Sequence, residues 1–84
     1  MEINPVEYKL TGGEFKLLQY LKSQVEAESV ADIAAKCGLS DRHVRKAANM
    51  LEAFSVIKIE RAGIIGQKKV NKYYLEDVEN WRIQ

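Results

Sequence analysis

Cationic and hydrogen-bonding side chains are concentrated within ten residues in the middle of this chain. Arg45 and Lys46 lie at the centre of this run. Guanidinium and ammonium groups bind phosphate oxygens, and Arg, His and Asn side chains can read the edges of bases in a DNA groove. The run therefore has the chemistry of a surface for double-stranded DNA. Its members are Ser40, Arg42, His43, Arg45, Lys46 and Asn49.

Two short amphipathic segments, joined at Gly38, must position this run. Ser29 and Ser40 are favourable N-caps, and Gly38 accepts the left-handed backbone that ends a helix. After each serine, apolar residues recur at the spacing of one helix face. This pattern predicts a helix-turn-helix over residues 29–55, a motif whose second helix enters the DNA major groove. The two apolar faces are Val30, Ile33, Ala34 and Cys37, then Val44, Ala47, Ala48 and Leu51.

The position of each polar residue on the second helix indicates its role. Arg45 lies on a flank, where we expect it to bind phosphate, and Ser40 with the amides after it can hold a phosphate at the helix start. The alternative is that the cations of this helix are solvated side chains that balance nearby carboxylates. The residues expected to contact bases, because the N-terminal half of such a helix enters the groove, are Arg42, His43, Lys46 and Asn49.

A further helix and a short strand are predicted before the helix-turn-helix. Residues 6–10 alternate apolar and polar side chains, which indicates a short edge strand. Thr11 and Glu14 have the spacing of a capping box, in which each side chain accepts from the backbone amide of the other. We expect the helix that follows to run from Gly13 to about Gln24.

After the helix-turn-helix the apolar period changes from that of a helix to that of a strand. Residues 57–61 alternate strictly and predict a strand with its isoleucines inward. Gly63 and Gly66 place a turn at residues 62–67, and β-forming residues at 68–75 predict the returning strand. This hairpin, a wing over residues 56–75, carries cations that would straddle the DNA backbone or enter the minor groove, or else protect an exposed strand edge. They are Arg61, Lys68, Lys69 and Lys72.

Apolar residues outside the expected core suggest contact surfaces. Ile64 and Ile65 fall in the predicted turn, where they would fold back on the domain or form a partner surface. Val78 and Trp81 are three residues apart in a tail that predicts one or two helical turns. They would cap the core or contribute to a homodimer interface.

The composition indicates one domain over residues 1–84 with a polarised charge. The chain has 84 residues, 46% of them hydrophobic, and one cysteine, so we expect a single core without disulfides in a reducing compartment. No apolar run predicts a membrane span or a signal peptide, and the expected location is cytoplasmic. Residues 36–72 hold nine basic and three acidic residues, whereas acidic residues exceed basic ones on both sides of this block. Such a chain can attract phosphate on one face.

Three helices followed by a basic hairpin describe a winged helix-turn-helix of the α+β class. The segment Leu39-Ser40-Asp41-Arg42-His43-Val44-Arg45-Lys46-Ala47, with Leu51-Glu52, is similar to the recognition-helix region of GntR-type and MarR-type regulators. It also resembles the helix-turn-helix domains of phage and plasmid replication proteins, as does Asn71-Lys72-Tyr73-Tyr74-Leu75. Two departures are Ser55, where these families usually carry glycine after the third helix, and the missing glycine-threonine wing ending of GntR-type proteins.

These observations predict a DNA-binding module rather than an enzyme. One His and one Cys are too few for a zinc site, no glycine-rich phosphate loop occurs, and no cofactor or small-molecule ligand is expected. We expect sequence-specific binding of double-stranded DNA in transcription regulation. The alternatives are the DNA-binding domain of a phage or plasmid replication initiator, and a winged-helix protein-protein interaction module.

Overall fold

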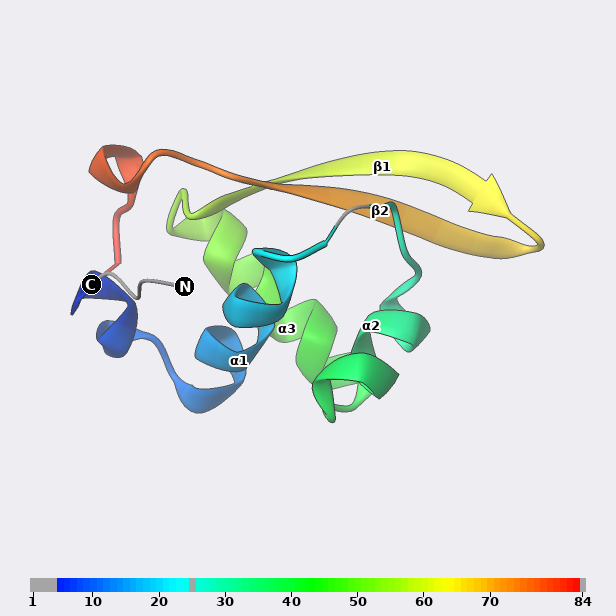
Figure 1. The fold of residues 1–84 in the computed structure, drawn as a ribbon, viewed down its shortest axis with the longest axis horizontal. Helices are drawn as coiled ribbons and strands as arrows, with labels where there is room; N and C mark the ends of the chain where they lie inside the picture. The colour runs from blue at the N-terminus through cyan, green and yellow to red at the C-terminus, as the bar shows by residue number, and fades with distance from the viewer. Residues whose placement is uncertain (1–4, 25, 84) are drawn as a thin grey trace.

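The computed structural model describes residues 5–24 and 26–83 as three helices followed by a two-stranded antiparallel hairpin (Figure 1). This α+β arrangement confirms the predicted class and order of the main elements and is compatible with a winged-helix layout. The elements are a 3-10 helix η1 (Pro5–Lys9), α1 (Gly12–Leu21), α2 (Val30–Cys37), α3 (Asp41–Ala53), β1 (Ile57–Ile65), β2 (Lys68–Leu75) and a second 3-10 turn η2 (Val78–Asn80).

Each helix begins at the cap that the sequence predicts. The Thr11 hydroxyl accepts from the Glu14 amide and the Glu14 carboxylate accepts from the Thr11 amide, so the capping box of α1 is confirmed. Ser29 Oγ accepts from the Asp32 amide, and Ser40 Oγ accepts from the His43 amide at 3.1 Å. The helices stay short because each side chain cap fixes a start and a local turn fixes the end.

The ends of the helices differ in how the backbone leaves them. Gly38 follows α2 with φ 71°, as predicted for a glycine at this position. Ser55 follows α3 with φ 60°, so a serine adopts the left-handed backbone that the resembling families give to glycine. α1 ends at Leu21 rather than near Gln24, where the backbone continues with i→i−3 hydrogen bonds from Ser23 and Gln24. The Gln24 side chain bonds to β2, accepting from the Tyr73 amide at 3.1 Å.

The predicted N-terminal strand over residues 6–10 is wrong. This segment is the 3-10 helix η1, in which Glu7 is 1% exposed. The Glu7 carboxylate lies 2.7 Å from Lys22 Nζ and accepts a hydrogen bond from Gln19 Nε2. An alternating strand would have turned Glu7 to solvent, but this ion pair with α1 holds the segment against the helix instead.

The hairpin is longer than predicted, and its turn lies elsewhere. β1 continues to Ile65, and only Gly66 and Gln67, with φ 54° and 69°, form the connection. Two consecutive positive φ angles are the signature of a type I′ turn, whose twist matches the strands. Gly63 serves another purpose: the register shifts between Arg61 and Gly63, so Ala62 is the extra residue of a β-bulge. The expected turn over residues 62–67 is therefore wrong.

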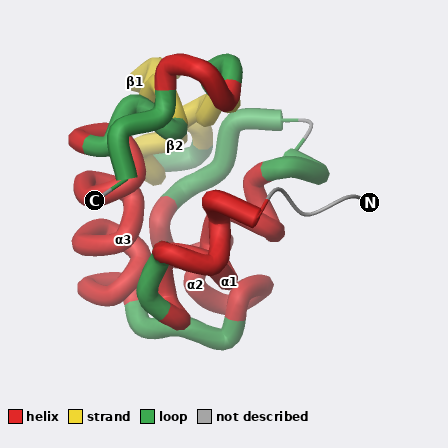
Figure 2. Tube along the Cα trace, turned by 90° about the vertical axis from the view of Figure 1, so that its left-hand side faces the viewer, coloured by secondary structure: helices red, strands yellow, loops and turns green. Residues whose placement is uncertain are grey.

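The core lies between the three helices and the near end of the hairpin. The apolar faces of α1, α2 and α3 meet Val56, Ile57 and Tyr73, and the tail residues Trp81 and Ile83 pack on the edge of this cluster. In both Figure 1 and Figure 2 the hairpin lies on one side of the helices. The C-terminal tail contains the expected helical turn as η2.

Candidate nucleic-acid interface

A groove of about 720 Å³ lies between α3, the hairpin and the start of α2. Arg45 and Asn49 line it from α3, and Arg61, Lys68 and Lys69 line it from the hairpin. Among the described residues that line this groove, four carry positive charge and none is acidic. The fold therefore brings five of the ten predicted site residues to one concavity.

The groove has an apolar floor and polar walls. Val44 and Ala48 contribute to it from the buried face of α3, and Val70 and Tyr73 contribute from β2. Arg45 and Asn49 are four residues apart, so they lie one helical turn apart on the same side of α3, and both are exposed. This arrangement places their donors at the rim, where a ligand seated in the groove would meet them.

Arg42 and Lys46 are exposed on α3 but do not line the groove. The helical repeat places them, with Asn49, on the side of α3 opposite its buried face. Ser40 caps this helix, and its hydroxyl is used to accept from the His43 amide. Three of the four predicted base-contacting residues, Arg42, Lys46 and Asn49, thus form a ridge beside the groove, with Asn49 belonging to both.

His43 lies apart from these residues, on the side of α3 that faces α1. A Cβ added to Gly13 of α1 would lie 2.2 Å from His43 Nε2. The imidazole therefore occupies the space that a side chain at position 13 would need. The sequence prediction grouped His43 with Arg42, Lys46 and Asn49, but the structure does not bring it into their ridge.

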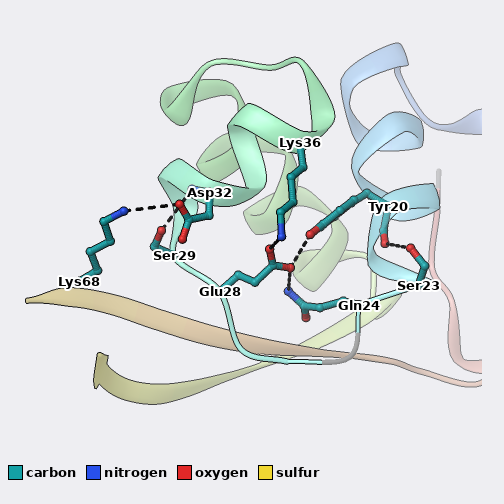
Figure 3. Close-up of polar contacts among 8 residues, drawn as sticks. All are labelled: Tyr20, Ser23, Gln24, Glu28, Ser29, Asp32, Lys36 and Lys68. Atoms are coloured by element: carbon teal, nitrogen blue, oxygen red, sulfur yellow. Dashed lines mark hydrogen bonds and ion pairs between the residues drawn. The ribbon is translucent and has the colours of Figure 1, made fainter. Parts of the chain in front are cut away.

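The hairpin cations have different surroundings. Lys68 Nζ is 3.5 Å from Asp32 Oδ1 at the start of α2, and both side chains remain at least half exposed (Figure 3). Hydrogen bonding with Ser29 and then the charge of Lys68 hold the pKa of Asp32 below its ordinary value. Lys72 points away from the groove: its Nζ donates to the Gln24 carbonyl oxygen and lies 5.9 Å from the centre of the Tyr74 ring. Lys72 therefore ties β2 to the connector after α1.

Sequence reasoning missed the network that holds the hairpin beside α2. Glu28 exchanges two backbone hydrogen bonds with Asn71 of β2. They form an isolated antiparallel β-bridge, so one residue of the connector pairs with β2 as a neighbouring strand would. The Glu28 carboxylate accepts from Tyr20 Oη, from Gln24 Nε2 and from Lys36 Nζ, the last at 2.7 Å (Figure 3). A one-residue bridge leaves no alternating pattern, and so no sequence signal, for a strand.

The charges of this network stabilise one another. Burial works against the charged form of Glu28, but hydrogen bonds from its three partners outweigh burial, so the pKa of this carboxyl lies below its ordinary value. Burial, and then the hydrogen bond to Glu28, raise the pKa of Tyr20 to about 12. The hydrogen bond to Glu28 also raises the pKa of Lys36. The network therefore stays charged and closed at neutral pH.

Residues 5–24 and 26–83 hold no group of three or more His, Cys, Asp or Glu side chains that could bind a metal ion. In the same part of the chain, no helix is both long and apolar enough to cross a membrane. Comparisons with protein-family models, with curated proteins and with solved structures found no match for this chain.

Proposed function

We propose that this chain binds double-stranded DNA as a winged helix-turn-helix. The observation that carries the proposal is the groove between α3 and the hairpin, which four cations line without any acidic residue among the described ones. A DNA strand is a row of phosphates, and its affinity for a protein comes largely from cations that displace its counterions. In this proposal Arg45 and Arg61, which line the groove from α3 and from β1, hold one sugar-phosphate backbone between them.

The ridge of α3 supplies the sequence-reading part of this proposal. Arg42, Lys46 and Asn49 project beside the groove, so a backbone seated there would bring the adjacent major groove onto them. Arg binds guanine and Asn binds adenine through paired hydrogen bonds at the base edge, which is the basis for specific recognition. We propose site-specific binding in transcription regulation as the biological use, and replication initiation as the second candidate on the Asn71–Leu75 resemblance.

Reversing the charge of two α3 cations tests the proposal. Arg45→Glu with Lys46→Glu should weaken binding to random duplex DNA by about 100-fold or more, because the attraction of Arg45 to phosphate and of Lys46 to the major groove both become repulsions. Fluorescence anisotropy with a labelled duplex measures the affinity. Both side chains are exposed, so circular dichroism and the melting temperature should not change.

The matched control is Lys9→Glu with Arg82→Glu, which makes the same change in net charge. Both are exposed, and their segments η1 and the C-terminal tail lie at the end of the molecule opposite the hairpin turn (Figure 1). The control should keep most of the wild-type affinity. Equal losses in the two variants would mean that net charge, and not this groove, governs binding. Wild-type affinity in the Arg45/Lys46 variant would refute the site.

A further inference from the structure

The outer part of the hairpin, residues 61–69, extends from the core as an exposed arm. Every residue in this range is exposed, whereas the next residue, Val70, is only 6% exposed. Figure 1 shows the arm running along the longest axis of the molecule. Because no buried side chain anchors residues 61–69, the position of the arm relative to the helices depends on contacts at the surface.

One ion pair joins the arm to α2. Lys68 Nζ lies 3.5 Å from Asp32 Oδ1 (Figure 3). Residues 61–69 are all described, and among them Lys68 is the one that forms an ion pair or a side-chain hydrogen bond with a helix. The Lys68 and Asp32 side chains are 57% and 50% exposed, so both remain accessible to a ligand from solution.

The carboxylate of this pair is fixed in place, whereas the ammonium group can move. Asp32 lies in the first turn of α2, where its backbone amide donates to the N-cap Ser29. Hydrogen bonding with Ser29, and then the charge of Lys68, lower the pKa of Asp32, which is therefore anionic at neutral pH. Lys68 is a long side chain on an exposed arm, so it is the partner that can leave for another anion.

The groove offers Lys68 a second anion when DNA is bound. Lys68 lines the groove together with Arg45, Arg61 and Lys69, but Asp32 does not line it. Carboxylate and phosphate oxygens bind the same ammonium group, so a phosphate seated in the groove would compete with Asp32 for Lys68. An exposed ion pair of this kind is weak and is screened by salt, which makes it displaceable.

We propose that Asp32 is an internal competitor of DNA: its carboxylate holds Lys68 in the free protein, and a DNA phosphate replaces it when a duplex enters the groove. This proposal rests on the DNA-binding function proposed above and adds to it an autoinhibitory contact between α2 and the hairpin. Binding has to break the ion pair first. Removing the Asp32 carboxylate should therefore raise the affinity for DNA, although that carboxylate lies outside the groove lining.

The test is a double-mutant cycle between the two members of the pair. Anisotropy of a labelled random duplex at about 50 mM salt measures the affinity. Asp32→Asn should bind about 3-fold more tightly, the effect expected for release of an exposed ion pair. In a Lys68→Gln background the same change has no pair to break, and most of the gain should disappear. Asn keeps the backbone amide that caps α2, and the melting temperature checks that the fold is retained.

Glu52→Gln is the matched control because it removes the same charge from an exposed position on α3, the helix that carries Arg45. Any gain in affinity from this change should be equal with and without Lys68→Gln. Lys69 provides a second comparison, since it lines the same groove and has no carboxylate partner among the described residues. Lys69→Gln should weaken binding more than Lys68→Gln does, and Asp32→Asn should remove most of this difference.

Titration of the Asp32 carboxyl by carbon-13 NMR tests the ion pair without DNA. In the free protein, Lys68→Gln should raise the pKa of Asp32, because the charge of Lys68 helps to lower it. Lys69→Gln should leave this pKa nearly unchanged. An Asp32 pKa that does not respond to Lys68→Gln would mean that the pair does not form in solution, and the internal competitor would be overturned.

The affinities separate failure of this proposal from failure of the proposed function. If the wild-type chain binds no DNA, the proposed function falls, and the internal competitor falls with it. If it binds DNA but Asp32→Asn gives the same gain with and without Lys68, Asp32 acts only through its long-range charge, and the internal competitor alone is overturned. Weaker binding by Asp32→Asn at an unchanged melting temperature would also overturn it, because the carboxylate would then support binding.

Discussion

At position 13, the lack of a side chain makes room for the imidazole of His43. The ring lies where a Cβ would project from α1, so the first turn of α1 and the start of α3 pack closely. The backbone conformation does not require glycine here, because only Gly38, Gly63 and Gly66 among the described glycines have positive φ. A side chain at position 13 would therefore have to move the exposed His43 ring aside.

This contact predicts coupling between the two residues. In a His43→Ala background, Gly13→Ala should stabilise the protein by about 0.5–1 kcal/mol, the usual gain from replacing glycine in a helix. In the wild-type background the same change has to displace the imidazole, and the gain should be smaller. Urea unfolding of the four variants measures the coupling.

Gly12→Ala is the control for this pair, since a Cβ at Gly12 would meet no atom within 4 Å. Its effect should not depend on the residue at position 43. Equal stabilisation by Gly13→Ala with and without His43 would contradict the contact.

At the scale of elements, the hairpin depends on the connector between α1 and α2. Glu28 joins this connector to β2 through its backbone and to α1 and α2 through its carboxylate, and Gln24 accepts from the Tyr73 amide. The orientation of the hairpin relative to α3, and so the width of the groove, follows from these contacts.

The lowered pKa of Glu28 predicts how removing its charge depends on pH. Glu28→Gln should lower the free energy of unfolding by about 1–2 kcal/mol at neutral pH, because hydrogen bonds to a charged acceptor are lost. A group whose folded pKa lies below its unfolded value contributes stability above the unfolded value and loses it as the pH falls through the folded one. The difference between wild type and variant should therefore shrink below about pH 4.5, the ordinary value for this carboxyl.

Glu26→Gln is the matched control because Glu26 is exposed on the same connector. It should change stability little at any pH. Chemical denaturation of the three proteins between pH 3 and pH 7 makes the comparison. A Glu28→Gln deficit that persists unchanged at pH 3 would mean that the carboxylate charge does not stabilise the fold.

At the scale of the whole molecule, the near-neutral net charge conceals a strongly uneven distribution of charged residues along the chain. The formal net charge is +1, yet residues 36–72 hold nine of the thirteen basic residues. The fold places four of them around one groove and leaves Arg42 and Lys46 on the adjoining ridge. Binding to a polyanion should therefore depend on local charge, in spite of the small overall charge.

This distribution predicts the salt dependence of DNA binding. If about five of these cations meet phosphates, the logarithm of the affinity should fall with the logarithm of salt concentration with a slope of about −4 to −5. Lys69→Gln should reduce the magnitude of that slope by about one, whereas Lys58→Gln, exposed on β1 away from the groove lining, should not. A slope near zero would contradict phosphate binding.

The sequence predicts best those features whose signals are local. The serine and threonine caps and the apolar spacing of α2 and α3 each lie within a few residues, and the structure confirms them. The predicted position of the hairpin turn is wrong because Gly63 lies next to a β-bulge, whereas Gly66 forms the turn. Glycine is favoured in both places, so its presence in the sequence does not distinguish a bulge from a turn. The contact of His43 with Gly13 and the bridge of Glu28 to Asn71 join distant residues, so no local pattern announces them.

The bulge at Ala62 affects the direction of the hairpin separately from the face to which each of its side chains points. Because Ala62 is the one unpaired residue, a chain lacking it would keep Arg61 opposite Asn71 and Gly63 opposite Val70, and every side chain beyond would keep its face. The extra residue adds only bend and twist. Deleting Ala62 alone would thus change the direction of the far end of the hairpin and leave the set of side chains on each of its faces unchanged.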